Sequence, residues 1–226
     1  MLIIDIETRG RKDLLNEYRA HEVEKKPELG SLSEDQWLSM MAVDHEYCEI
    51  ICIGIKQVKG ETRILDSIEQ LGTEEWNRWL TQMPLITFNG KGFDLPILIK
   101  HGKKLGLNLP YERLQNACKR FGYGDRHTDL MENLAMGGKP KSLDTYLRIY
   151  LRIQKKTSGA EFFKTATVEE IKQHCREDLE LEEKLYIYFY GYRENKNKES
   201  VGGTESSNPY KRPSKKNTDP IESTVL

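Results

Sequence analysis

The sequence begins Met1-Leu2-Ile3-Ile4-Asp5-Ile6-Glu7-Thr8, a short apolar run that carries two acids. A run of this length and composition predicts a buried β-strand. Because strand side chains alternate between the two faces, Asp5 and Glu7 share one face, and Ile4 and Ile6 lie on the other. Two like charges side by side on a central strand are unfavourable unless a cation neutralises them. The pair therefore indicates a metal site, although Glu7 at an exposed strand end and Asp5 paired with a basic side chain would explain it too.

Strands and helices alternate along most of the chain. A second strand over 49–55 is followed by a turn at 59–61 and a third strand over 62–65. Thr73 precedes an amphipathic helix, a fourth strand covers 85–88, and the last helix begins at about 168. This alternation predicts an α/β fold and argues against an all-β or all-helical one.

Two segments differ from this pattern. The charge-rich stretch at about 9–43 contains helix-like pieces over 12–20 and 33–40, with Ser33 as an N-cap, and is interpreted as an insertion. The C-terminal residues are rich in Gly, Ser, Asn, Pro and Lys and contain almost no large aliphatic residues. We therefore expect a folded domain over 1–194 and a disordered tail over 195–226.

The composition excludes several classes of protein. The 35 basic and 36 acidic residues give a net charge of −1, which excludes a strongly basic nucleic-acid coat protein. No apolar run reaches the roughly 18–20 residues of a membrane helix, and no signal-peptide pattern follows Met1. The four cysteines form no Cys-x-x-Cys pair and predict reduced thiols in a cytoplasmic protein, not a disulfide framework or zinc site.

A second acidic motif follows the predicted fourth strand, in the run FNGKGFDLPIL at 88–98. Asn89 and the two glycines suit a turn with positive backbone angles. Asp94 falls at the start of the next helix, where an acid is favoured by the free N–H groups and the helix dipole. Read alone, Asp94 is either an N-cap or a catalytic acid.

A third motif lies on the last helix, in the run HCREDLELEEKLY at 174–186. At 100° per residue, Asp178 lies within about 20° of Ile171 on the core-facing arc, and His174 lies at its edge. A buried acid one turn from a histidine requires a partner. Glu182 falls in the same arc, so the periodicity alone does not single out Asp178.

Together these motifs resemble those of the DEDD superfamily of 3′–5′ exonucleases, which has a ribonuclease H-like fold. The chain is most similar to the predicted exonucleases related to the proofreading domain of family B DNA polymerases, on FNGKGFDLPIL, RHTDLM at 126–131 and HCREDLELEEKLY. The resemblance spans about 1–192 and is poor over 9–43. It implies a mixed five-stranded sheet flanked by helices. His174 stands four residues before Asp178, where the proofreading type has tyrosine, whereas the histidine subfamily has histidine five residues before.

The resemblance also implies the chemistry. Asp5, Glu7, Asp94 and Asp178 would hold two divalent metal ions, Mg²⁺ or Mn²⁺. Asp5 would bridge both ions, Glu7 and Asp178 would complete the site that holds the attacking water, and Asp94 would act mainly through a metal-bound water. His174 would be the general base or would orient that water.

Substrate contacts are expected at three further residues. By the resemblance, Thr8 would contact the 3′-terminal nucleotide, while Asn89 would support the Asp94 turn. Phe93 would stack on a base or pack in the core. Asp129 precedes an apolar helix and is interpreted as its N-cap, with a metal ligand as the alternative.

The resulting hypothesis is a 3′–5′ exonuclease that acts on a single-stranded 3′ end, with DNA favoured as the substrate. An RNA-trimming enzyme of the same superfamily and a catalytically weak nucleic-acid-binding module are the alternatives. Roles in DNA repair or antiviral defence would both suit a free-standing exonuclease.

Overall fold

The computed structural model describes residues 1–119, 126–156 and 160–191, without the side chains of residues 160 and 161. Its compact unit runs from Met1 to Gly191. The strands are β1 (Leu2–Gly10), β2 (Cys48–Gln57), β3 (Thr62–Leu65), β4 (Leu85–Thr87) and β5 (His127–Asp129). The α-helices are α1 (Leu15–Lys25), α2 (Glu34–Ala42), α3 (Glu74–Gln82), α4 (Asp94–Lys104), α5 (Tyr111–Ala117), α6 (Leu130–Ala135), α7 (Leu143–Tyr146), α8 (Ala160–Thr165) and α9 (Val168–Tyr190).

The five strands form one mixed sheet in the order β3-β2-β1-β4-β5. β1 pairs antiparallel with β2 and parallel with β4, so the strand with the first acids is central. β3 is antiparallel to β2, and β5 is parallel to β4. This confirms the predicted α/β fold with a mixed five-stranded sheet.

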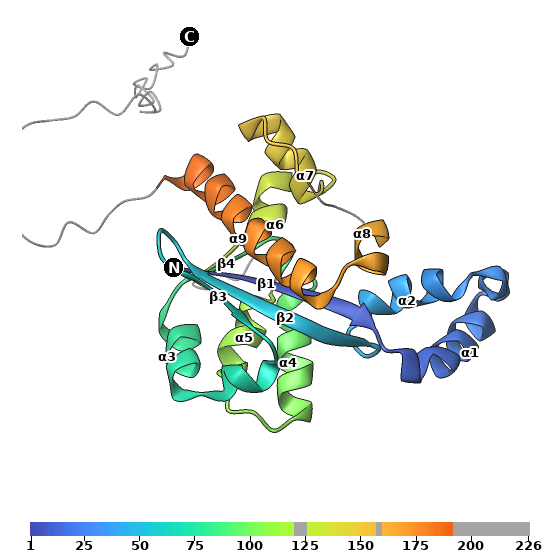
Figure 1. Cartoon of the computed structure of the whole chain (residues 1–226). Helices are drawn as coiled ribbons and strands as arrows, with labels where there is room; N and C mark the ends of the chain where they lie inside the picture. The colour runs from blue at the N-terminus through green and yellow to red at the C-terminus, as the bar shows by residue number, and fades with distance from the viewer. Residues whose placement is uncertain (120–125, 157–159, 192–226) are drawn as a thin grey trace, which may run out of the picture. The chain divides into compact units, whose positions relative to one another are not determined.

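Helices cover both faces of the sheet (Figure 1). On one face, Leu2, Ile4 and Ile6 of β1 pack with side chains of α3, α4 and α5 in a buried apolar cluster. On the opposite face α9 crosses β1, β2 and β3. Asp5 and Glu7 lie on the face opposite the isoleucines, as the strand periodicity predicted, and this is the face that α9 covers.

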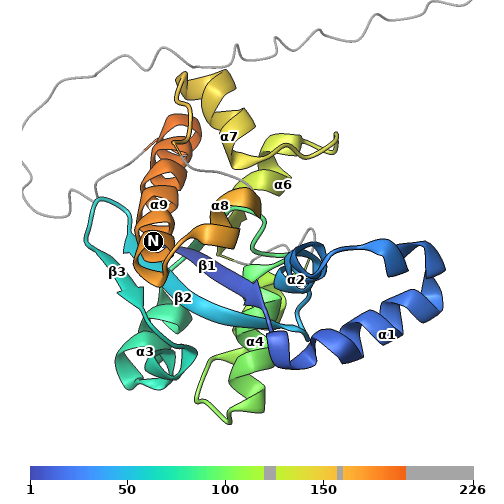
Figure 2. The same ribbon diagram turned by 45° about the vertical axis from the view of Figure 1, so that its right-hand side comes forward.

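The inserted segment is longer at its C-terminal side than its composition suggested. Arg9 and Gly10 still pair with Glu49 and Cys48, so the segment between β1 and β2 is 11–47, not about 9–43. It contains α1 and α2, which extend from one end of the sheet (Figure 2). Ser33 is the N-cap of α2, as predicted, in a capping box with Gln36.

The expected boundary at 194 and the expected tail over 195–226 lie outside the described residues. Helix α9 starts at a second capping box, between Thr167 and Glu170, and continues to Tyr190. Among the described helices, none is long and apolar enough to cross a membrane.

Candidate active site

β1 presents Asp5 and Glu7 to α9 at a point where the helix lies very close to the sheet. Asp5 pairs with Gly54 of β2, and a Cβ on Gly54 would stand 2.5 Å from Cys175 Sγ and 2.6 Å from a Leu179 methyl. A larger residue there would push α9 away from the two acids. The ladder also shifts register between Glu7 and Thr8, an irregularity that changes the direction of neighbouring side chains.

α9 contributes His174 and Asp178, which lie one turn apart on its buried side. His174 Nε2 is 3.6 Å from Asp178 Oδ2 and 4.0 Å from Glu7 Oε1. The imidazole is buried, and the rings of Phe162 and Phe163 pack against it. The structure thus brings the predicted histidine between acids of two different elements.

Asp94 is the first residue of α4, and its carboxylate bonds to the backbone of the sheet. Its Oδ1 accepts a hydrogen bond of 2.9 Å from the Ile6 amide, between the two acids of β1. Phe93, not Asp94, occupies the N-cap position of α4. Asp94 is buried and belongs to the acidic cluster, so the N-cap interpretation does not describe its position.

The turn before Asp94 is held from outside by Asp129. Asn89 has a φ of 67°, and its carbonyl accepts hydrogen bonds from the Gly92 and Phe93 amides. The Asp129 carboxylate accepts from the Asn89 and Lys91 amides at 3.1 and 3.0 Å. It also accepts from the amide of Glu132, which confirms the predicted N-cap of α6. Asn89 therefore supports the turn through its backbone.

Burial and mutual repulsion raise the pKa values of three of the clustered acids. Burial, and then the negative charge of Asp178, raise the pKa of Asp5 to about 7. Burial and the charge of Asp5 raise the pKa values of Glu7 and Asp94 well above their ordinary ones. Burial lowers the pKa of His174, which favours its neutral imidazole. Ionisation of these acids would therefore be favoured by a bound cation.

The donor atoms present fit a divalent cation. One ligand atom each of Glu7, His174 and Asp178 lies within 4.8 Å of the others, and the same holds for Asp5, Glu7 and Cys175. Glu7 is common to the two groups. Asp5 Oδ2 and Asp178 Oδ1 are inaccessible and accept no hydrogen bond from the described residues. Orphaned carboxylate oxygens are the hard donors that Mg²⁺ and Mn²⁺ prefer.

Two residues of the site were not singled out by the sequence. The Lys155 ammonium donates to Asp178 Oδ2 at 2.5 Å, and both side chains are nearly buried. Nothing in the local sequence around Lys155 indicates this contact. Glu182, one turn beyond Asp178, is 2% exposed, and its Oε2 has no partner among the described residues. Burial and the charge of Asp5 raise the pKa of Glu182 well above its usual range.

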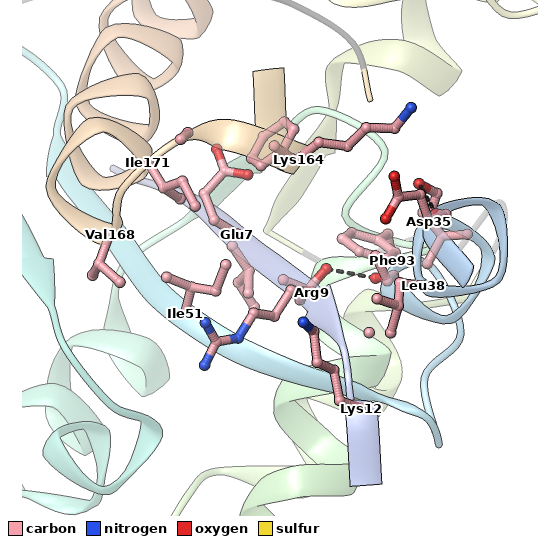
Figure 3. Close-up of a pocket in the computed structure, with 18 residues that line it drawn as sticks. Glu7, Arg9, Lys12, Asp35, Leu38, Ile51, Phe93, Lys164, Val168 and Ile171 are labelled. Carbon is pink, nitrogen blue, oxygen red and sulfur yellow. Dashed lines mark hydrogen bonds between the residues drawn. The ribbon is translucent and has the colours of Figure 1, made fainter. Parts of the chain in front are cut away.

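A pocket of about 590 Å³ opens beside the acids (Figure 3). Glu7 and Thr8 of β1 and Phe93 line it, together with residues of α2 and of the start of α9. The Thr8 hydroxyl donates to the Ala42 carbonyl at 2.6 Å. Phe93 is half-buried beside this pocket and is not part of the apolar cluster under the sheet. The structure thus gathers Thr8 and Phe93 at the pocket and leaves Asn89 in the turn.

One solved structure has a fold similar to that of this chain. The chain is similar in structure to a family B DNA polymerase from the hyperthermophilic archaeon Pyrobaculum calidifontis, with a TM-score of 0.51 and 15% identity. The match covers 82% of this chain but only 24% of the polymerase, and at this identity it shows the fold alone. None of the curated proteins is detectably similar to the chain.

The family comparison is more specific. The model of a family described as predicted 3′–5′ exonucleases related to the exonuclease domain of PolB matches residues 43–197, more than half of the chain. This range includes Asp94, His174 and Asp178, and it begins after Asp5 and Glu7. The chain belongs to the family of predicted 3′–5′ exonucleases related to the exonuclease domain of PolB.

Proposed function

We propose that this protein is a metal-dependent exonuclease that hydrolyses phosphodiester bonds from the 3′ end of DNA and releases nucleoside 5′-monophosphates. The observation that carries the proposal is the meeting of Asp5, Glu7, Asp94 and Asp178, from three separate elements, beside a pocket lined by Glu7. Buried acids at this density are unfavourable in a purely structural role. The cluster is therefore best explained by cation binding.

Two divalent ions, Mg²⁺ or Mn²⁺, would supply charge stabilisation to the attacked phosphoryl group and to the leaving oxygen. We assign Asp5 to both ions, and Glu7 and Asp178 to the side on which water attacks. Asp94 is anchored to the Ile6 amide, and we assign it to the opposite side. In these roles a bound metal ion would offset the free-energy cost of burying each ionised carboxylate.

His174 would take a proton from the attacking water at Nε2, which faces Glu7 and Asp178. The water oxygen forms a bond to phosphorus as the P–O3′ bond breaks. The O3′ of the shortened strand then takes up a proton. A neutral imidazole is required to accept the proton, and burial of His174 lowers its pKa in that direction.

The pocket would hold the 3′-terminal nucleotide. Its volume of about 590 Å³ falls in the range of small-molecule sites. Phe93 offers an aromatic face to a base, and such stacking is independent of base identity. Thr8 lies next to Glu7 at the same wall. DNA is favoured as the substrate because the family is related to the exonuclease domain of a DNA polymerase, PolB. We propose that the 3′ end which enters the pocket is single-stranded.

The test is digestion of a 5′-labelled DNA single strand with Mg²⁺ or Mn²⁺, with and without EDTA. We expect a ladder that shortens from the 3′ end and disappears with EDTA. Asp5→Ala and Asp178→Ala should lose the activity and keep the fold, measured by circular dichroism. Glu180→Ala is the matched control, because Glu180 is an exposed acid on the same helix. Turnover at the wild-type rate in either Asp variant would overturn the site.

An RNA strand of the same sequence separates the substrate classes. Faster digestion of RNA than of DNA would show that RNA is the substrate, and the proposed hydrolysis would still hold. Binding of both strands without cleavage of either, with both metals, would overturn the exonuclease in favour of a nucleic-acid-binding module.

A further inference from the structure

The segment that connects β1 to β2 is much longer than the short turn that would be sufficient to join them. The two strands are antiparallel, and their ends are paired at Gly10 and Cys48. Two residues can connect such strands. Residues 11–47 intervene instead, and the Arg11 amide donates to the Tyr47 carbonyl at 3.0 Å where the segment leaves and returns. We call residues 11–47 the α1–α2 hairpin. All of it up to residue 42 lies outside the family match.

The hairpin is fixed firmly against β1. The Thr8 hydroxyl bonds to the Ala42 carbonyl at the end of α2. At Gly10 a Cβ would lie 2.5 Å from the Leu38 carbonyl oxygen, so α2 approaches the strand as closely as only glycine permits. Tyr18, Trp37 and Met41 form a small buried core within the hairpin. These contacts give the hairpin a defined position beside the first acidic motif.

A second attachment joins the hairpin to the turn that carries Asp94. His45 Nε2 is 3.1 Å from the Gly92 carbonyl oxygen, and the His45 ring lies 6.1 Å from that of Phe93. Glu46 forms an ion pair with Lys100 of α4. The hairpin thus contacts both segments that supply acids to the N-terminal part of the site.

Helix α2 forms one wall of the pocket. Leu38, Ser39, Ala42 and Val43 face the cavity from this side. Figure 3 shows Leu38 and Phe93 on one side and Val168 and Ile171 on the other, with Glu7 near Ile171. Because the hairpin is attached to both β1 and the Asp94 turn, this wall does not retract without breaking several contacts.

We propose that the α1–α2 hairpin restricts the pocket to an unpaired 3′-terminal nucleotide. The proposal rests on the proposed function and adds its specificity determinant. When the terminal nucleotide is still paired, its base is bonded along one edge to a nucleotide of the complementary strand, which brings the backbone of that strand with it. With a fixed wall on the α2 side, the pocket excludes this second strand. A duplex end must therefore open before its last nucleotide enters.

The test removes the α1–α2 hairpin and joins β1 directly to β2, whose ends are already paired. Residues 12–46 are replaced by Asn-Gly, which favours a tight turn between antiparallel strands. Digestion rates are measured on a 5′-labelled single strand and on the same strand annealed into a flush duplex. For the wild type we expect the paired end to be about tenfold slower, the factor that opening one base-pair step imposes. In the excised chain we expect this ratio to fall to about threefold or less.

Point variants keep the test decisive if the excised chain does not fold. Leu38→Ala with Val43→Ala widens the pocket from the α2 side and should lower the same ratio. Glu24→Ala, on the exposed side of α1, is the matched control and should change neither rate. An unchanged ratio in the folded excised chain, or in the double variant if excision prevents folding, would overturn the hairpin proposal alone. A wild type that shows no metal-dependent digestion of single strands would instead overturn the proposed function.

Discussion

Neutralising Asp5 should stabilise the metal-free protein while it removes activity. Burial and the nearby Asp178 raise the pKa of Asp5 to about 7 in the folded chain, against 3.8 for the ordinary group. A folded-state pKa above the unfolded one means that stability decreases as the pH rises between these two values, and that it is constant above the higher one. The difference between the two pKa values of Asp5 corresponds to a loss of about 4 kcal/mol in the free energy of unfolding at pH 8. In a chain of this length, removing this loss should raise the Tm by about 8–16 °C.

The assay is thermal unfolding of wild type and Asp5→Asn in EDTA, followed by circular dichroism from pH 4 to pH 8. Near pH 4 the two chains should melt together, because Asp5 is then protonated in the folded state. The variant should melt progressively higher than the wild type up to about pH 7, and by a constant margin above it. Added Mg²⁺ should raise the Tm of the wild type at pH 8, because an ion that binds only the folded state stabilises it.

The refuting results are specific. If Asp5→Asn melts at or below the wild-type temperature at pH 8, the burial of an ionised Asp5 beside Asp178 does not limit stability. A gap of the same size at every pH would mean that the amide improves packing and that ionisation of Asp5 is not involved. Glu180→Gln removes an exposed charge from α9 and should leave the Tm within about 1–2 °C at each pH.

Three further substitutions test individual contacts. Lys155→Met leaves Asp178 without its buried partner and should lower stability by about 3–5 kcal/mol in EDTA at pH 8, measured by urea unfolding; an unchanged urea midpoint would contradict this. Gly54→Ala places a methyl group against Cys175 and should cost about 1–3 kcal/mol and reduce turnover, because α9 must move; wild-type stability would show that α9 yields freely. Asp129→Ala removes the acceptor of three amides and should accelerate their hydrogen exchange, measured by NMR, with unchanged exchange as the contrary result.

The central acids could be predicted from sequence because their signals are local. Alternation along β1 is enough to place Asp5 and Glu7 on one face, and the polar turn with Asn89 is enough to locate the start of α4. The periodicity of α9 identifies the buried stripe that includes Asp178. In each case the physical cause acts over a few neighbouring residues, so one chain segment contains the whole pattern.

The other contacts depend on tertiary structure. Lys155 reaches Asp178 from a segment 23 residues away, and no local pattern indicates such a partner. The helical stripe cannot separate Asp178 from Glu182, because the choice depends on where α9 crosses β1. Likewise, propensity predicts the helices of the insertion but not their contact with Gly10. That contact depends on the absence of a side chain in one element and a carbonyl in another.

The charge balance of the site favours two ions over one. If Asp5, Glu7, Asp94 and Asp178 are all ionised, and Glu182 keeps the proton that its raised pKa favours, the site carries four negative charges, against one positive charge on the nearby Lys155. One divalent ion would leave the site negative, and a phosphodiester would add a further negative charge and be repelled. Two divalent ions would leave it with one positive charge, which a single phosphodiester neutralises. In a buried site of low polarity, the difference in electrostatic free energy between the one-ion site and the two-ion site is large. The proposed two-ion site is therefore the one in which substrate binding itself completes electroneutrality.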